Sequence, residues 1–130
     1  MRRLGPLSSG VAVGNNGSAT ATADTGVIIS GRVIAVGVVY LDSPPAGTTD
    51  VVVATKGTNG PAQTLLSLAN AATDGWWYPR VGAHSTAGAA MLYAAGGTAV
   101  GEPLAVHDLV NVSIAQANAG DSVDVWLLME

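Results

Sequence analysis

The stretch VIAVGVVYL at residues 33–41 decides the fold of this chain. It is apolar at every position, whereas a strand with one solvated face alternates apolar and polar residues. Its β-branched side chains favour a strand over a helix. We therefore expect a long strand over residues 27–41 with both faces covered, one by the protein core and the other by a second surface.

Other strand patterns follow along the chain, separated by turns rich in Gly, Pro, Asn and Asp such as residues 42–47. The expected strands lie at residues 18–23, 27–41, 49–55, 63–68, 76–78, 91–93, 110–114 and 123–128. For residues 63–68 a short helix is the alternative. Residues 110–114 and 123–128 alternate around a bend at 117–121, which predicts a closing hairpin. Seven or eight short strands without a helical repeat predict an all-β, single-domain, jelly-roll-like β-sandwich.

The first 25 residues have a different character from the rest. They contain few large side chains and are interrupted by Gly5, Pro6, Gly10, Gly14 and Gly17. Such a segment cannot order itself by burying apolar surface. We expect residues 1–25 to be an extended N-terminal arm and residues 26–130 to be the sandwich domain.

The charge content is the most informative part of the composition. Charged residues make up 11% of the 130 residues, against about 25% in an average soluble domain. Five Lys and Arg against nine Asp and Glu give a net charge of −4, which argues against nucleic acid or an anionic membrane as a partner. The mean hydropathy is +0.39. Another protein is the expected cover for much of this surface.

Catalytic and cofactor signals are weak. The chain has no Cys, no Walker loop, no dinucleotide fingerprint and no G-x-S-x-G motif. His107 and Asp108 are neighbours, but neighbours on a strand point to opposite faces, so they do not form a dyad. His84 and His107 are better interpreted as hydrogen-bonded loop or strand-end residues. We predict no catalytic residue, no cofactor and no enzyme activity.

Three carboxylates, Asp42, Asp50 and Asp74, lie next to turns. Their spacing does not match a calcium-binding EF-hand loop. Asp at such positions usually caps backbone N–H groups. We therefore predict capping roles for them and no metal site.

Aromatic residues give the strongest functional signal. On a strand, Trp76 and Tyr78 point one way and Trp77 the other, and Arg80 shares the parity of the first two. Trp126 and Leu128 lie opposite the apolar face that Val123, Val125 and Leu127 form. Trp, Tyr and Arg are enriched in interface hot spots, although burial in the core explains clustered aromatics equally well. The candidate capsid- or self-interface residues are Arg2, Arg3, Trp76, Trp77, Tyr78, Arg80, Trp126 and Leu128.

Three stretches of the chain resemble the cement or decoration proteins of tailed-bacteriophage capsids. They are residues 42–53, which resemble a strand–turn–strand of small phage head proteins, residues 73–80, and the closing segments 109–114 and 125–128. The similarity covers about residues 30–130. It implies a compact β-fold that sits as a homodimer or homotrimer on the outside of a phage head, is assembled in the bacterial cytoplasm, and bridges major capsid protein subunits against internal DNA pressure.

The low charge content and the lack of catalytic motifs also fit a cement role independently of this resemblance. A shell cement needs many weak contacts over a neutral surface rather than chemistry. Arg2 and Arg3 could pair with acidic groups of a capsid subunit, or belong to a disordered tail.

Two other classes of function stay open. The first is a carbohydrate- or receptor-binding module that stacks sugars on Trp76, Trp77 and Tyr78, and the second is a small β-sandwich enzyme built around a histidine.

Overall fold

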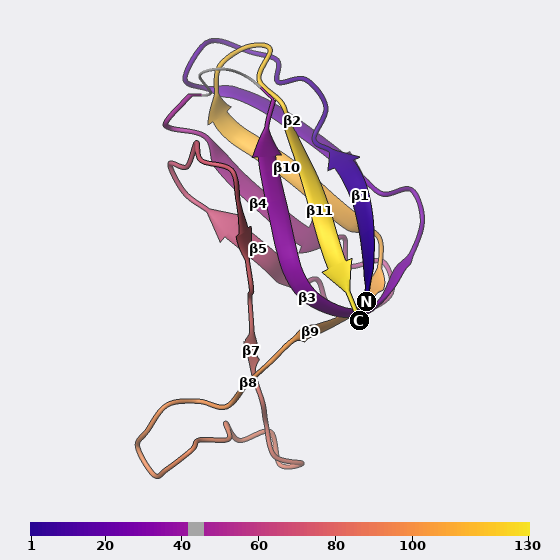
Figure 1. The fold of residues 1–130 in the computed structure, drawn as a ribbon, viewed down its shortest axis with the longest axis vertical. Helices are drawn as coiled ribbons and strands as arrows, with labels where there is room; N and C mark the ends of the chain where they lie inside the picture. The colour runs from indigo at the N-terminus through magenta and orange to yellow at the C-terminus, as the bar shows by residue number, and fades with distance from the viewer. Residues whose placement is uncertain (42–45) are drawn as a thin grey trace.

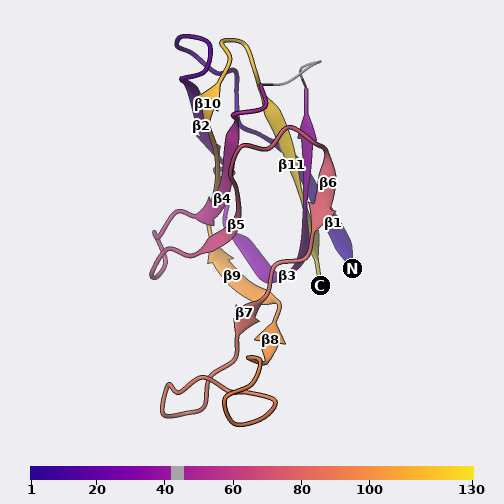
Figure 2. The same ribbon diagram turned by 90° about the vertical axis from the view of Figure 1, so that its left-hand side faces the viewer.

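Two antiparallel sheets packed face to face form the body of the computed structural model, which describes residues 1–41 and 46–130 (Figures 1 and 2). Within these residues there are eleven strands and no helix. The predicted all-β sandwich is confirmed, with more strands than expected, because residues 2–8 and 104–108 also form strands and residues 81–82 pair with 101–102. Most of the predicted turn at residues 42–47, including Asp42, lies outside the described residues.

The first sheet is built around the long strand that the sequence predicted. Its strands are β1 (Arg2–Ser8), β11 (Val123–Met129), β3 (Ile29–Tyr40), β6 (Gly75–Trp77) and β9 (Leu104–Asp108). β11 pairs with one edge of β3. The other edge is shared, because β9 pairs with Ile29–Val33 and β6 with Val36–Val38.

The second sheet has the order β2-β10-β4-β5. Its strands are β2 (Ala19–Asp24), β10 (Val110–Ala117), β4 (Asp50–Thr55) and β5 (Thr64–Leu68). The alternative of a short helix at residues 63–68 is thereby decided in favour of a strand.

The core lies between the sheets and follows from period-two alternation. Burial alternates at every position of β4 and β11. The facing side chains are mostly Val, Leu and Ile, among them Val36, Val53, Ile114 and Leu127, each at most 1% exposed. β-branched residues suit such a pleated, tightly packed layer. The sandwich therefore has an apolar centre that needs no disulfide, in a chain without Cys.

The predicted N-terminal arm is wrong for residues 1–25. β1 pairs with β11 and β2 pairs with β10, so these residues supply an edge strand to each sheet. Leu4 and Leu7 pack against the core, and Ala12 and Ala19 belong to it. These residues are ordered although their side chains are small, because backbone pairing with β11 and β10 stabilises them in place of the burial of large side chains.

The predicted closing hairpin is also wrong. β10 belongs to the second sheet and β11 to the first, so residues 118–122 cross between sheets. Both strands turn alternate side chains into the same core, from opposite sides. Alternation in sequence reports which face is buried but not which strand lies alongside, and this pattern therefore fits a crossover as well as a hairpin.

A forked arm, residues 81–102, projects from one end of the sandwich (Figures 1 and 2). Its stalk is the pair β7 (Val81–Gly82) and β8 (Gly101–Glu102). Beyond the stalk, isolated bridges join His84 to Ala90 and Leu92 to Ala99, which makes two short hairpins. The strand expected at residues 91–93 is reduced to one of these bridges.

Candidate functional site

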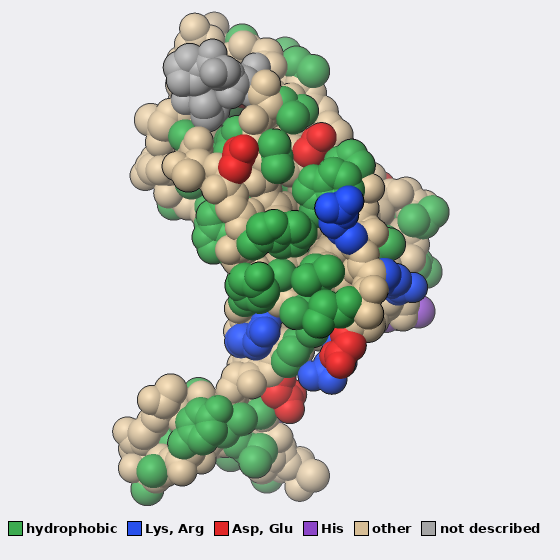
Figure 3. All heavy atoms as spheres, in the orientation of Figure 1, with side chains coloured by type: hydrophobic (Ala, Val, Ile, Leu, Met, Phe, Trp, Pro, Cys, Tyr) green, Lys and Arg blue, Asp and Glu red, His purple; other side chains and the backbone are tan. Residues whose placement is uncertain are grey.

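The outer face of the first sheet gathers large apolar and cationic side chains (Figure 3). We call it the tryptophan face and define it by the outward side chains Arg3, Val39, Trp76, Trp126 and Leu128. They come from β1, β3, β6 and β11, which lie side by side in the sheet. Trp76 is 45% exposed and Val39 37% exposed, while Trp126 and Leu128 are half-buried.

Strand register places the two tryptophans at the same level of the sheet. Gly37 of β3 is paired with Trp126 on one side and with Trp76 on the other. A Cβ at Gly37 would lie 3.0 Å from three atoms of the Trp76 ring, so this indole rests directly on the glycine. Gly37 is thus the reason that Trp76 can pack close to the sheet.

A second glycine supports Trp126 in the same way. A Cβ at Gly5 of β1 would lie 2.9 Å from Cε3 of Trp126 and 2.8 Å from a backbone oxygen. Gly5 also has a φ of 134°, a conformation that side-chain-bearing residues rarely adopt. Both indoles therefore lie over positions without side chains.

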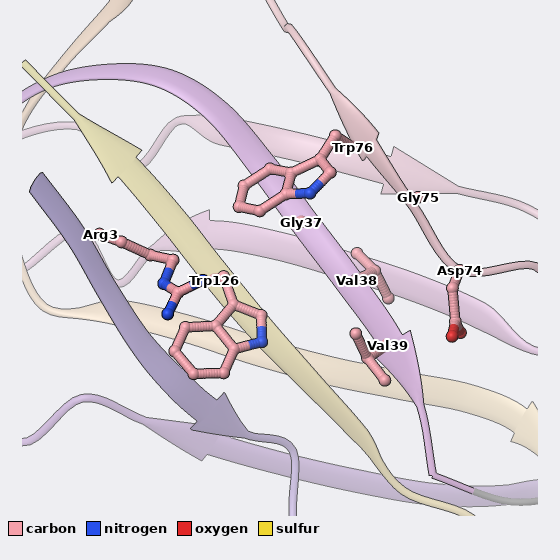
Figure 4. A pocket seen from close by; sticks show the side chains of 8 residues that line it. All are labelled: Arg3, Gly37, Val38, Val39, Asp74, Gly75, Trp76 and Trp126. Atoms are coloured by element: carbon pink, nitrogen blue, oxygen red, sulfur yellow. The ribbon is translucent and has the colours of Figure 1, made fainter. Parts of the chain in front are cut away.

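A hollow of about 360 Å³ lies between the two indoles (Figure 4). Val38, Val39, Gly37 and Gly75 line its floor and wall, and the charged residues Arg3 and Asp74 line its rim. The Arg3 guanidinium carbon lies 4.8 Å from the centre of the Trp126 ring, a cation–π contact. Asp74 is anchored, because its Oδ1 accepts a hydrogen bond of 2.8 Å from the Tyr40 N–H.

The aromatic triplet divides as strand parity requires. Trp76 and Tyr78 are exposed, at 45% and 60%, whereas Trp77 packs against the core. Trp77 therefore lies on the inner side of the sheet and is not part of the tryptophan face, while its role in an interface stays a prediction. Arg80 lies beside this surface, where its Nη1 donates hydrogen bonds to the carbonyls of Ile34 (3.0 Å) and Pro79 (2.8 Å).

Arg2 and Arg3 have different surroundings although they are neighbours. Arg3 is opposite Leu128 in the sheet and contacts Trp126. Arg2 is exposed at the end of β1, and its Nη2 donates a 2.9 Å hydrogen bond to the carbonyl of Ser30. The tryptophan face thus includes Arg3, while Arg2 lies at its margin.

Within residues 1–41 and 46–130 no hydrogen bond or ion pair joins a histidine to a carboxylate, although His107 and Asp108 line one hollow of about 200 Å³. His84 is exposed in the forked arm, and Nδ1 of His107 lies 3.1 Å from the hydroxyl of Ser30. Asp108 points the other way and accepts hydrogen bonds from the N–H groups of Gly57 (2.7 Å), Thr58 (3.0 Å) and Leu109 (2.8 Å). Burial raises the pKa of this carboxyl, but these backbone bonds outweigh it and hold the pKa below its usual value. The predicted opposite orientation of His107 and Asp108 is confirmed.

The turn carboxylates Asp50 and Asp74 accept hydrogen bonds from backbone N–H groups, but from distant segments and not from the local groups that the prediction assumed. Asp50 accepts a 2.9 Å hydrogen bond from the N–H of Asn70, and Asp74 accepts the bond from Tyr40. Both bonds span more than a single turn of the chain. Within residues 1–41 and 46–130, no three His, Asp or Glu side chains group as metal ligands would.

The forked arm is a second candidate region, which sequence reasoning missed. Val81, Met91, Leu92 and Tyr93 are 43%, 46%, 41% and 75% exposed there. The signal was present, because residues 81–101 contain no Asp, Glu, Lys or Arg. This segment is rich in Ala and Gly and does not alternate apolar with polar residues, so its sequence predicts neither a clear strand nor a projecting arm.

Comparison with known proteins gives no relative: no protein-family model, curated protein or solved structure matches the chain. Among the described residues, no helix has the length and apolar character needed to cross a membrane.

Proposed function

We propose that this chain is a structural virion protein that binds the outer surface of a phage capsid and cements neighbouring major capsid protein subunits. The phage setting comes from the sequence resemblance. The single observation that supports the binding role is the tryptophan face, an exposed sheet surface that carries two indoles and a stacked arginine.

The make-up of this face suits a protein partner. Trp, Tyr and Arg dominate the binding energy of protein interfaces, where they form a buried centre with a more polar rim. Here Trp76 and Trp126 form the centre, and Arg3 and Asp74 stand at the rim. Packing over Gly5 and Gly37 holds the indoles in place before binding, so that less side-chain entropy is lost on association.

A repeated shell multiplies such contacts. Each single contact needs only a modest affinity. When one molecule makes several linked contacts with the shell, the first contact raises the effective concentration for the next. The few charged side chains fit a neutral apolar contact better than one steered by electrostatics. This role requires no catalytic group from the chain.

The test is a size measurement of the purified protein with and without empty phage shells, followed by pelleting of the shells. Trp126→Ala should weaken attachment by at least about 2 kcal/mol, or ~30-fold in Kd, as expected for a central interface tryptophan. The matched control is Val27→Ala, at an exposed residue outside the tryptophan face. Normal attachment of the folded Trp126→Ala protein, or no pelleting of the wild type, would contradict the proposal.

A second candidate function is carbohydrate binding, and the hollow between the two indoles favours it. Two tryptophans at one level, on strands whose backbones are about two strand spacings or ~9.6 Å apart, form a platform on which linked sugar rings could stack. Arg3 and Asp74 would supply hydrogen bonds to hydroxyl groups. Glycan-array binding by the isolated protein, lost in Trp76→Ala, would decide for this function.

A further inference from the structure

Two Asn–Gly pairs lie in loops of this chain, Asn16–Gly17 and Asn59–Gly60, and all of these residues are exposed. Asn–Gly is a sequence that turns favour. It is also the pair in which an asparagine side chain most easily meets its own backbone, because a following glycine has no Cβ to obstruct the approach. The surroundings of the two pairs therefore decide which of them can react.

The reaction is deamidation through a succinimide. The glycine amide nitrogen gives its proton to a base in solution and attacks Cγ of the asparagine, so that a bond between nitrogen and Cγ forms. The bond between Cγ and Nδ2 then breaks, and Nδ2 takes a proton and leaves as ammonia. Water opens the ring by breaking one of its C–N bonds, which yields aspartate or isoaspartate. Water and hydroxide are the only reactants from outside the chain, and no group is oxidised or reduced.

Hydrogen bonds hold both reacting groups of the Asn16–Gly17 pair. The Gly17 N–H donates to the carbonyl of Ala117 at 2.9 Å and to Oδ1 of Asn118 at 3.1 Å. Oδ1 of Asn16 accepts a 3.1 Å hydrogen bond from the N–H of Ala119. The attacking nitrogen and the amide that must turn toward it are both tied to residues 117–119, so these bonds must break before the ring can close.

The Asn59–Gly60 pair lacks these restraints. In the part of the chain that the structure describes, neither the Gly60 N–H nor the Asn59 side chain has a hydrogen-bond partner. No atom lies within 4 Å of a Cβ built on Gly60, which leaves space for the ring. Gly17 has the same open space, so hydrogen bonding and not crowding distinguishes the two pairs.

The loop around Asn59 is anchored next to the pair. The N–H groups of Gly57 and Thr58 donate to Oδ2 of Asp108 at 2.7 and 3.0 Å. Asn59 and Asp108 line the same hollow of about 200 Å³. Deamidation would therefore add a negative charge beside the carboxylate that holds the loop, in a chain whose net charge is already −4.

We propose that Asn59 is a site of spontaneous deamidation in the folded protein, and that the fold protects Asn16 from the same reaction. Breaking the hydrogen bonds of the Asn16–Gly17 pair adds to the barrier there, so reaction at Asn16 should be slower by at least about tenfold. The proposal needs only water as a partner and does not depend on the cement role.

The test measures the uptake of oxygen from heavy-oxygen water. The wild-type protein is incubated in this water at mildly alkaline pH, returned to ordinary water, digested with trypsin and analysed by mass spectrometry with fragmentation. Cleavage after Lys and Arg puts the two pairs on separate peptides, residues 4–32 and 57–80. We expect heavy oxygen at Asn59 and at least about tenfold less at Asn16. No uptake at Asn59, or equal uptake at both positions, would overturn the proposal.

Two controls test whether the fold causes the difference. In guanidinium chloride the two pairs should react at similar rates, because the hydrogen bonds of the folded chain are lost. Asn118→Ala removes one acceptor of the Gly17 N–H, so uptake at Asn16 should rise several-fold while uptake at Asn59 stays the same. If Asn59 still reacts much faster in the unfolded chain, or if Asn118→Ala leaves Asn16 as slow as before, protection by the fold is refuted.

Asn59→Gln is the matched variant for the site itself. Glutamine keeps the amide, but its longer side chain closes a ring on the backbone far more slowly. Uptake at position 59 should therefore disappear in this variant, and uptake as fast as that of the wild type would overturn the succinimide route.

Discussion

The tryptophan face and the forked arm are both exposed and apolar, yet the protein builds them differently. Behind the face lies a layer of fully buried side chains such as Val36 and Leu127, and its indoles rest on Gly37 and Gly5. The arm has backbone hydrogen bonds but no buried layer. The comparison teaches that the core and two glycines hold the face in place, whereas backbone hydrogen bonds alone hold the arm, which should therefore open more easily.

The largest expected effect comes from the layer behind the face. Leu127→Ala removes a fully buried side chain of β11, so we expect a loss of about 3 kcal/mol in the free energy of unfolding. Urea denaturation measures it. A loss below about 1 kcal/mol would show that the core under the tryptophan face is loosely packed, and the contrast with the arm would weaken.

A smaller effect is expected at the glycine beneath Trp76. The new methyl group in Gly37→Ala would lie 3.0 Å from the indole and displace it, at a cost of about 1–2 kcal/mol. Tryptophan fluorescence should shift to longer wavelength and unfolding should occur at lower urea.

Gly82→Ala is the matched control in the arm, where no atom lies within 4 Å of the added methyl group, and it should change stability by less than about 0.5 kcal/mol. Equal effects of the two substitutions would contradict the difference between the regions.

Tyr40 at the end of β3 offers a gain instead of a loss. It is 8% exposed, and its hydroxyl has no hydrogen-bond partner within the described parts of the chain. Burial, and then the charge of Asp74, raises the pKa of this hydroxyl. Tyr40→Phe removes an unsatisfied buried group, so we expect stability to rise by about 1 kcal/mol in thermal or urea unfolding. A loss of similar size would show that the hydroxyl is bonded in solution.

The smallest effect should come from the arm itself. Leu92→Ala changes the same residue type as Leu127→Ala, but Leu92 is 41% exposed, so the unfolding free energy of the monomer should change by less than about 0.5 kcal/mol. Unfolding at a protein concentration too low for association is the measurement. A loss comparable to that of Leu127→Ala would mean that the arm packs on its own sandwich.

Part of the candidate site was predictable from residue parity. The alternation at residues 76–78 separates Trp76 and Tyr78 from Trp77, and it indicates that one side of the triplet stays outside. That Trp126 lies opposite the buried face of β11 followed in the same way. The sequence does not show that Gly37 places the two tryptophans at one level, because register between distant strands depends on pairing that no local pattern encodes.

The sequence by itself determined β2–β6, β10 and β11 and, in the alternating strands such as β11, the buried face, because period-two alternation and β-branched side chains act locally. Only the tertiary structure decided which strands became neighbours. It put β10 and β11 in different sheets, turned residues 1–25 into edge strands, and placed the projecting arm at residues 81–102. The physical reason is that pairing and sheet assignment minimise exposed apolar surface and unpaired backbone over the whole chain at once, a balance to which each local segment contributes only a part.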